Sequence, residues 1–245
     1  MNNKFIFDVD GTLTPSRKTI DPNFRRFFLE FAESHFCYLV TGSDRKKTLE
    51  QVGEEICNAC IRVYNCSGTD VYEEDRNVRR VNWDVPDDLV GHLYEELDRS
   101  EFPIRNGLHL EYRPGGLNFS ILGRGSGEGW HRDEYVKWDK KYKERKKIAS
   151  RLKEKFSDIE VQVGGQTGLD LAPKGNNKSM ILSDFSTLDK LHFFGDMMDE
   201  GENDYPLAKA VKDMGGIPYH VKNWKETRTI LKGFHDLDPG RKLYN

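Results

Sequence analysis

The fold follows from one stretch near the start of the chain, Phe5-Ile6-Phe7-Asp8-Val9-Asp10-Gly11-Thr12-Leu13-Thr14. Apolar residues that run into two carboxylates are typical of a buried parallel strand with Asp8 and Asp10 at its carboxyl end. Open α/β sheets bind their ligands at that end. Because two like charges this close repel, a cation such as Mg²⁺ or a shared proton is expected between them. The alternative for Asp-x-Asp-Gly alone is a solvated turn in which an Asp caps the next helix.

The length of 245 residues allows one large domain, or a core domain with an insert. Charged residues make up 32% of the chain and no run of about 18 apolar residues occurs, which predicts a soluble protein without a membrane span. The net charge of −3 gives no general attraction to nucleic acid, so we expect no nucleic-acid partner. The first strand begins too early to leave room for a signal peptide, and we expect a cytoplasmic protein.

The four cysteines, Cys37, Cys57, Cys60 and Cys66, allow two interpretations. The Cys57-x-x-Cys60 spacing with Cys66 nearby suggests zinc, but a second pair is missing. We therefore expect buried free thiols in a reducing compartment.

In the first 80 residues, expected helices alternate with expected strands, as an α/β sheet requires. Asp21 caps and Pro22 opens a helix with a stripe of phenylalanines. Thr41-Gly42-Ser43 follows a second strand at 36–40, and a hydroxyl with free amides at such a junction can bind phosphate. The alternative for this loop is an ordinary helix cap. The other elements expected here are a helix from Asp44 to about Ile56, a strand at 62–65, a turn at 66–69 and a charged hairpin at 71–81.

Between residues 81 and 176 the pattern of expected helices and strands changes to that of a compact α+β insert. Pro114-Gly115-Gly116 between two alternating runs indicates a hairpin. We also predict strands at 159–163 and 169–172, a helix from 85–87 to about Leu97, and one long basic helix at 133–156 whose lysines and arginines are a solvated face. After the insert, strands and helices alternate again. We expect a strand at 191–196, a helix that ends at Gly215-Gly216, a strand at 217–221 and a helix at 225–231. This predicts a core domain of residues 1–80 and 177–245 around an inserted domain of residues 81–176.

Three features, taken in order, resemble the motifs of the haloacid-dehalogenase superfamily of phosphotransferases. They are the Asp8–Thr14 stretch, Lys178 before a buried strand, and Phe194-Gly195-Asp196 with Asn203-Asp204. An ordinary surface lysine is the alternative for Lys178 taken alone. The resemblance implies an α/β fold, a Rossmannoid parallel-sheet core with an inserted α+β cap of type IIB. It implies that Asp8 is the nucleophile, Asp10 the general acid/base, and that Lys178 and Ser43 neutralise the transferring group. The implied Mg²⁺ ligands are Asp8, Asp10 through its carbonyl, Asp196 and Asp204.

The insert carries a more specific resemblance, to the cap of the eukaryotic-type phosphomannomutases. It rests on the string from Glu111 to Arg124, on Arg132-Asp133-Glu134-Tyr135, on Gly164-Gly165-Gln166, on Leu169-Asp170 and on Pro173-Lys174-Gly175. By position, Arg17, Arg113, Arg124 and Arg132 would hold substrate phosphates, and Asp170 would bond a sugar hydroxyl. The substrate-binding position at Gly168 departs from the family, which has a serine there, and the glycine-rich segment 125–131 is one residue longer. A surface salt bridge is the alternative for any single arginine, and a solvated loop charge is the alternative for Arg17.

The family resemblance implies interconversion of mannose 6-phosphate and mannose 1-phosphate through an aspartyl phosphate. It further implies activation by a hexose 1,6-bisphosphate, supply of GDP-mannose synthesis, and a homodimer through the cap. A mutase needs two phosphate sites at once, and clustered arginines in an acidic chain suit the second one. The rivals are a sugar-phosphate phosphatase of the same fold, a phosphoglucomutase, and a non-catalytic sugar-phosphate-binding protein. Binding alone would not need a nucleophile, so Asp8, Asp10, Lys178 and Asp196 argue against the last.

Overall fold

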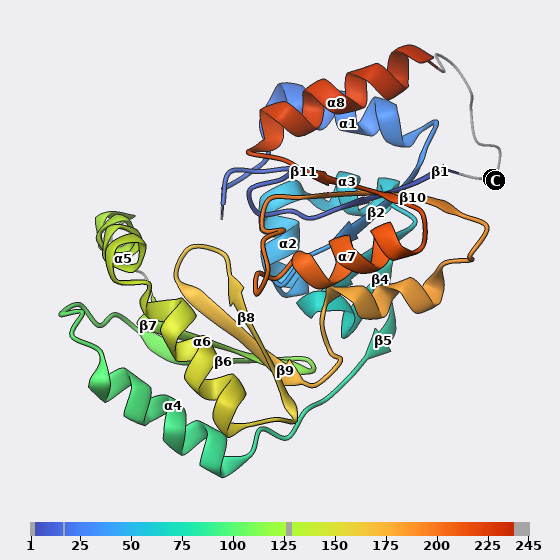
Figure 1. Ribbon diagram of the computed structural model, residues 1–245. Coiled ribbons are helices and arrows are strands. Elements are labelled where there is room, and N and C mark those ends of the chain that lie inside the picture. Colours follow the sequence, from blue (N-terminus) through green and yellow to red (C-terminus); the bar gives the residue numbers. More distant parts are fainter. Residues whose placement is uncertain (1–2, 17, 126–128, 238–245) are drawn as a thin grey trace.

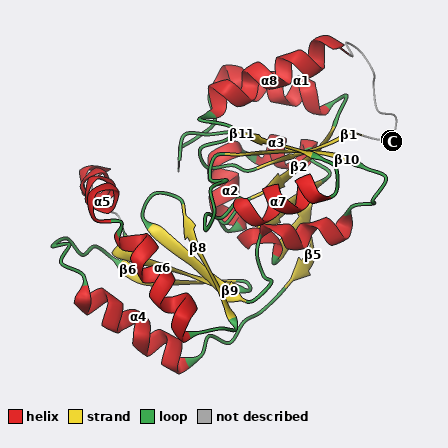
Figure 2. Cartoon of the chain, in the orientation of Figure 1, coloured by secondary structure: helices red, strands yellow, loops and turns green. Residues whose placement is uncertain are grey.

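Two sheets organise the part of the chain that the computed structural model describes, residues 3–16, 18–125 and 129–237 (Figure 1). The larger sheet has seven strands in the order β11-β10-β1-β2-β3-β4-β5, and the smaller has four in the order β6-β7-β9-β8. Helices cover both faces of the larger sheet and one face of the smaller sheet (Figure 2), so each sheet has its own hydrophobic core. No described helix is both long enough and apolar enough to cross a membrane.

The larger sheet is built around β1 (Asn3–Phe7), which lies parallel to and between its two neighbours. Its other parallel strands are β2 (Phe36–Val40), β3 (Arg62–Asn65), β10 (Lys190–Gly195) and β11 (Ile217–His220), and an antiparallel hairpin of β4 (Asp70–Glu73) and β5 (Arg76–Arg80) completes it. Phe5, Ile6 and Phe7 are fully buried. A strand covered on both faces has no exposed side to make polar, which is why β1 is apolar without interruption.

The layers of helices follow from the alternation of side chains along β1. Phe5 and Phe7 pack against α1 (Pro22–Ala32), α2 (Arg45–Val52), α3 (Glu54–Ala59) and α8 (Trp224–Leu237) on one face. Ile6 packs with the 3₁₀ helix η2 (Lys178–Asp184) and α7 (Tyr205–Asp213) on the other. Asp21 caps α1 as predicted, because its carboxylate accepts from the backbone N–H groups of Asn23 and Phe24.

The smaller sheet is antiparallel throughout and belongs to the insert. Its strands are β6 (Leu108–Arg113), β7 (Gly116–Arg124), β8 (Ile159–Gly164) and β9 (Gly168–Pro173). Helices α4 (Asp87–Arg99) and α6 (Glu144–Lys155) cover the face that is turned away from the larger sheet, and α5 (Gly129–Tyr142) stands at one end (Figure 1). The open face of the smaller sheet therefore looks toward the carboxyl edge of the larger one.

The prediction of one long helix at 133–156 is wrong. Lys143 adopts a left-handed conformation, with φ 55 and ψ 35, and separates α5 from α6. Tyr135 and Ile148 are both buried in the core of the insert. A straight helix would place residues 13 apart about 140° from one another around its axis. The break is what allows both side chains to face the same core.

The predicted helix from Asp44 to about Ile56 is also two helices. Gly53 joins α2 to α3 and has φ 82, a backbone conformation that residues with a side chain rarely adopt. The last helix runs to Leu237 rather than Leu231. The predicted strands and the hairpin at 71–81 are confirmed, and all four cysteines are buried and free.

The two sheets divide the chain in the manner of the predicted domains. Strands of the larger sheet end at Arg80 and resume at Lys190, and all strands of the smaller sheet lie between these positions. This division supports our proposal of a core of residues 1–80 and 177–245 and a cap of residues 81–176. The two parts are called the core and the cap below.

Candidate active site

A cleft of about 480 Å³ is lined by residues from the carboxyl edge of the core sheet and by residues of the cap. Its core wall includes Asp8, Asp10, Thr41, Ser43, Asp196 and Asn203. Its cap wall includes Arg113, Asn118, Arg124, Arg132 and Gly168. The structure therefore brings most of the predicted site residues to one cavity. Arg17, the remaining predicted arginine, lies outside the described residues.

Three carboxylates converge at the core wall. One oxygen from each of Asp8, Asp196 and Asp204 lies within 4.8 Å of the others. Asp8 follows β1 and Asp196 follows β10, its parallel neighbour, so the sheet itself places them together. Gly11 admits Asp196 to this cluster, because a Cβ at residue 11 would lie 2.0 Å from Asp196 Oδ2. Gly11 also has φ 84, so the position suits glycine on both counts.

Lys178 provides the positive charge of this cluster. Its fully buried ammonium donates to Asp8 Oδ1 and to Asp204 Oδ1, both at 2.6 Å. Asp204 Oδ2 accepts from the backbone N–H of Met197 at 3.1 Å, which fixes the orientation of that carboxylate. Although burial alone would lower it, the pKa of Lys178 is raised by Asp204 and Asp8, so the group stays charged.

One ammonium does not balance three carboxylates. Burial raises the pKa of Asp8 to about 7 even though Lys178 lowers it. Burial, followed by the charges of Asp8 and Asp204, raises the pKa of Asp196 to about 9. Both shifts have the same cause, which is negative charge that is removed from water without enough positive charge beside it.

The donor set fits a hard dication. Carboxylate and amide oxygens are the ligands that Mg²⁺ prefers, and a charge of +2 would balance the cluster. Asn203 Oδ1 adds a further oxygen on this wall, since it is buried and has no hydrogen-bond partner among the described residues. The carboxylate of Asp10 is not part of the cluster, so its predicted role as a ligand rests on its backbone carbonyl alone.

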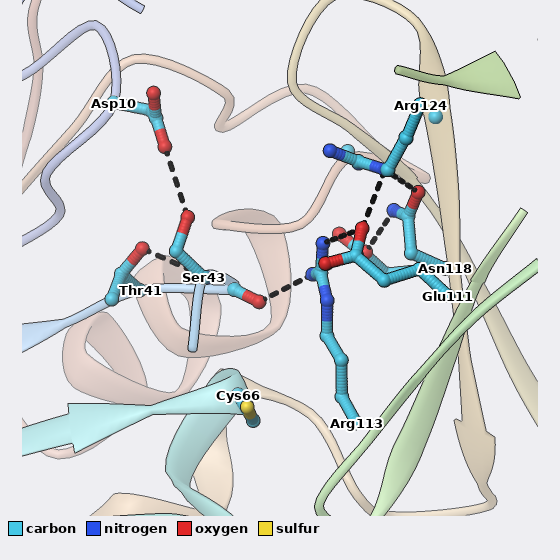
Figure 3. A network of polar contacts seen from close by, with 12 residues as sticks. Asp10, Thr41, Ser43, Cys66, Glu111, Arg113, Asn118 and Arg124 are labelled. Atoms are coloured by element: carbon cyan, nitrogen blue, oxygen red, sulfur yellow. Dashed lines mark hydrogen bonds and ion pairs between the residues drawn. The ribbon is translucent and has the colours of Figure 1, made fainter. Parts of the chain in front are cut away.

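The side chain of Asp10 is instead held by two neighbours. Its Oδ1 accepts from Gln51 Nε2 at 3.0 Å, and its Oδ2 from Ser43 Oγ at 3.4 Å (Figure 3). The backbone N–H of Ser43 donates to Thr41 Oγ1 at 3.1 Å, which orders the 41–43 loop. Sequence reasoning missed Gln51. Gln51 could have been recognised as a polar residue on the side of the predicted helix that carries its apolar residues.

A row of polar side chains crosses the cap wall. Glu111 on β6 pairs with Asn118 on β7, and Asn118 pairs with Asp170 on β9. Residues directly opposite in an antiparallel sheet point to the same face, and here that face is the one turned toward the core. Of these three side chains, only Asn118 lines the cleft itself. Sequence reasoning assigned no role to Glu111 or Asn118, because the predicted hairpin did not give the register of its two strands or their pairing with the strand that carries Asp170.

Arg113 and Arg124 join Glu111, Asn118 and Asp170 into a closed ring of contacts. Figure 3 labels four of its members, Glu111, Arg113, Asn118 and Arg124. Arg124 Nε donates to Asn118 Oδ1 at 2.7 Å and lies 2.8 Å from Glu111 Oε2 in an ion pair. Asn118 Nδ2 donates to Asp170 Oδ1 at 2.6 Å, and Arg113 Nη1 lies 3.5 Å from the same oxygen. Arg113 Nη2 donates to Glu111 Oε2 at 3.0 Å and completes the ring.

The cap also contacts the core directly through Arg113. Its Nη1 donates to the backbone carbonyl of Gly42 at 2.6 Å, in the loop expected to bind phosphate. Arg132 lies elsewhere on the cap wall, where its Nε donates to Gln166 Oε1 at 2.7 Å. Gly168 leaves room for the ring, because a Cβ there would lie 2.8 Å from Asn118 Nδ2 and 3.2 Å from Arg124 Nη2.

Comparison with known proteins points to one family. The sequence profile described as eukaryotic phosphomannomutase matches residues 24–236. A phosphomannomutase of Arabidopsis thaliana is 31% identical over 218 residues, which cover 86% of this chain and 88% of that protein. A probable phosphomannomutase of Caenorhabditis elegans is 30% identical over 239 residues, which cover 91% of each.

Solved structures resemble the chain in fold. A haloacid dehalogenase-like hydrolase from Bacteroides thetaiotaomicron superposes with a TM-score of 0.54 at 13% identity, over 96% of this chain and all of that one. The C-terminal domain of the C. albicans trehalose-6-phosphate phosphatase gives 0.60 at 14% identity, over 95% and 92%. At these identities the likeness concerns the fold alone, and it confirms the predicted haloacid-dehalogenase-like core with an insert.

Proposed function

The chain belongs to the eukaryotic phosphomannomutase family, and on that premise we propose that it interconverts mannose 6-phosphate and mannose 1-phosphate. One observation supports this above the others: the cleft has two chemically different walls. The core wall offers carboxylates and a buried lysine, and the cap wall offers arginines. An enzyme that moves a phosphoryl group between two ends of one sugar needs a transfer site and a second anion site in the same cavity.

The transfer site is Asp8 in this proposal. Lys178 holds its Oδ1, and the other oxygen attacks phosphorus. A bond forms between that oxygen and phosphorus as the bond from phosphorus to the sugar oxygen breaks. Phosphoryl transfer depends mainly on positioning and charge stabilisation, which the buried ammonium supplies.

Asp10 is the proton carrier in the same step. It gives a proton to the departing sugar oxygen, and takes one from the sugar hydroxyl that later attacks the aspartyl phosphate. Gln51 and Ser43 hold its carboxylate, so the group is oriented before substrate arrives.

Asp8, Asp196 and Asp204, with the Asp10 carbonyl, would hold Mg²⁺, which when bound neutralises phosphate oxygens. A hexose 1,6-bisphosphate would supply the first phosphoryl group. The cap arginines would hold whichever phosphate is not being transferred while the sugar reorients. For the setting of the reaction we propose the cytoplasm, a homodimer through the cap, and supply of GDP-mannose synthesis.

A single incubation tests the activity. The protein is mixed with mannose 1-phosphate, Mg²⁺ and a trace of hexose 1,6-bisphosphate, and both mannose 6-phosphate and inorganic phosphate are measured. We expect mannose 6-phosphate to form faster than free phosphate. Release of phosphate without isomerisation would identify a phosphatase instead, and a parallel run with glucose 1-phosphate would reveal a phosphoglucomutase.

A further inference from the structure

Glu111 lies behind the cap arginines rather than in the cleft. Arg113 and Arg124 both line the cavity, whereas Glu111 is absent from its lining. One carboxylate oxygen, Oε2, accepts from Arg113 Nη2 at 3.0 Å and forms an ion pair with Arg124 Nε at 2.8 Å. Glu111 therefore reaches the cleft only through these two guanidinium groups.

Glu111, Arg113 and Arg124 are shielded enough from water for the contacts between them to hold the arginines in place. The exposed fractions are 10% for Arg113, 17% for Arg124 and 30% for Glu111. Exposed ion pairs contribute little because water screens them and the side chains stay free to move. Charge-assisted hydrogen bonds to a partly buried carboxylate are stronger and hold a defined geometry.

The charges explain why a shared carboxylate is needed. Two guanidinium groups on adjacent strands repel each other, and each would rotate away if nothing held them. Glu111 lies against both, and Asp170 lies 3.5 Å from Arg113 on its other side. The backbone carbonyl of Gly42 fixes Arg113 from the core, so the position of Arg124 depends mainly on Glu111 and Asn118.

We infer that Glu111 is a positioning residue that sets the spacing of Arg113 and Arg124 for the phosphate of a hexose phosphate. The inference rests on the proposed function, since it concerns the second anion site of the same cleft. A carboxylate between two arginines could instead compete with the incoming phosphate. The two roles predict opposite effects on affinity when the charge of Glu111 is removed.

The test is the Glu111→Gln variant, titrated with mannose 6-phosphate in a calorimeter. The amide keeps the shape of the side chain but removes the negative charge that faces both guanidinium groups. We expect the dissociation constant to rise about tenfold, since a contact between two charged groups is stronger than one with a neutral acceptor. In turnover, KM should rise by a similar factor while kcat changes less, because Glu111 touches no reacting group.

The cap offers a matched control at Glu96. This residue, on α4, is 1% exposed and also joins two arginines, accepting from Arg99 Nη1 at 2.8 Å and from Arg151 Nε at 2.7 Å. It is on the layer of helices that faces away from the core (Figure 1). Glu96→Gln should lower the melting temperature but leave the affinity for mannose 6-phosphate within about twofold.

A double-mutant cycle separates positioning from a general loss of cap stability. In an Arg124→Gln background, Glu111 has only Arg113 left to hold, so Glu111→Gln should weaken binding by about threefold or less. Additive effects would mean that Glu111 does not act through Arg124. An unchanged or tighter affinity in the single variant would overturn the inference.

The measurements also keep this inference apart from the proposed function. If the wild-type protein binds mannose 6-phosphate without isomerising it, the proposed function fails while the affinities still decide the role of Glu111. If the wild-type protein binds no hexose phosphate, both fail.

Discussion

The two walls of the cleft are built by different rules. On the core wall, functional groups follow the carboxyl ends of parallel strands, and negative charge exceeds positive charge. On the cap wall, functional groups stand on the face of an antiparallel sheet, and the ring balances two arginines with Glu111 and Asp170. The core wall is therefore suited to a cation, whereas the cap wall is held together mainly by its own residues. Chemistry is expected from the first wall and recognition from the second.

The largest effect should come from the core wall. Asp8→Asn keeps the shape of the side chain but removes the nucleophile, so we expect turnover to fall by at least about 10³-fold. The fold should survive, because Lys178 keeps its bond to Asp204. The measurements are mutase activity and the melting temperature. Activity within tenfold of wild type, with purity established, would remove Asp8 from its proposed role.

The charge imbalance of the core wall gives the next effect. Chelation should abolish activity and Mg²⁺ should restore it, and Asp196→Ala should raise the Mg²⁺ concentration for half-maximal activity by at least about tenfold. Asp199→Ala is the matched control, since Asp199 lies in the same loop but outside the carboxylate cluster. Superimposable Mg²⁺ titrations of wild type and Asp196→Ala would contradict the metal site.

A substitution on the cap wall should affect recognition without affecting transfer. Arg132→Gln removes a charged donor from the cleft, and kcat/KM for hexose phosphates should fall about 10-fold to 150-fold. Slow hydrolysis of a small aryl phosphate should change little, because it uses only the core wall. The readout is the ratio of the two activities, and a parallel fall would show that Arg132 is structural.

The smallest effect should come from the position at which the chain departs from its family. Gly168→Ser introduces a Cβ within 2.9 Å of the Asn118 amide, so the ring must shift. We expect KM for mannose 6-phosphate to rise about threefold to tenfold, the consequence of moderate overpacking. A lower KM would mean that the added hydroxyl binds substrate better than the undisturbed ring does.

Local patterns predicted most of the core wall. Asp8 and Asp196 end buried strands, Thr41 follows another, and parallel strands bring such ends to one edge. The order of these motifs along the chain was therefore enough to expect a common site. The family resemblance added Lys178, which bonds to Asp8 although 170 positions separate them.

The helix predictions failed for a physical reason. A helical stripe over 133–156 is continuous in composition, but in the structure its residues reach one core from two helices, which are separated at Lys143. Gly53 breaks the helix after Asp44 in a similar way. Neither break is evident until the surface on which the helix packs is known.

The sequence by itself determined the strands, the positions of the carboxylates and the arginine string of the cap, because each depends on neighbouring residues. Only the tertiary structure decided that Glu111, Asn118 and Asp170 stand in one row, since this requires the register of three strands. It also decided that Gln51 holds Asp10 and that Arg113 reaches the carbonyl of Gly42. These contacts join residues that are far apart in the chain, and their geometry is fixed by packing rather than by any local preference.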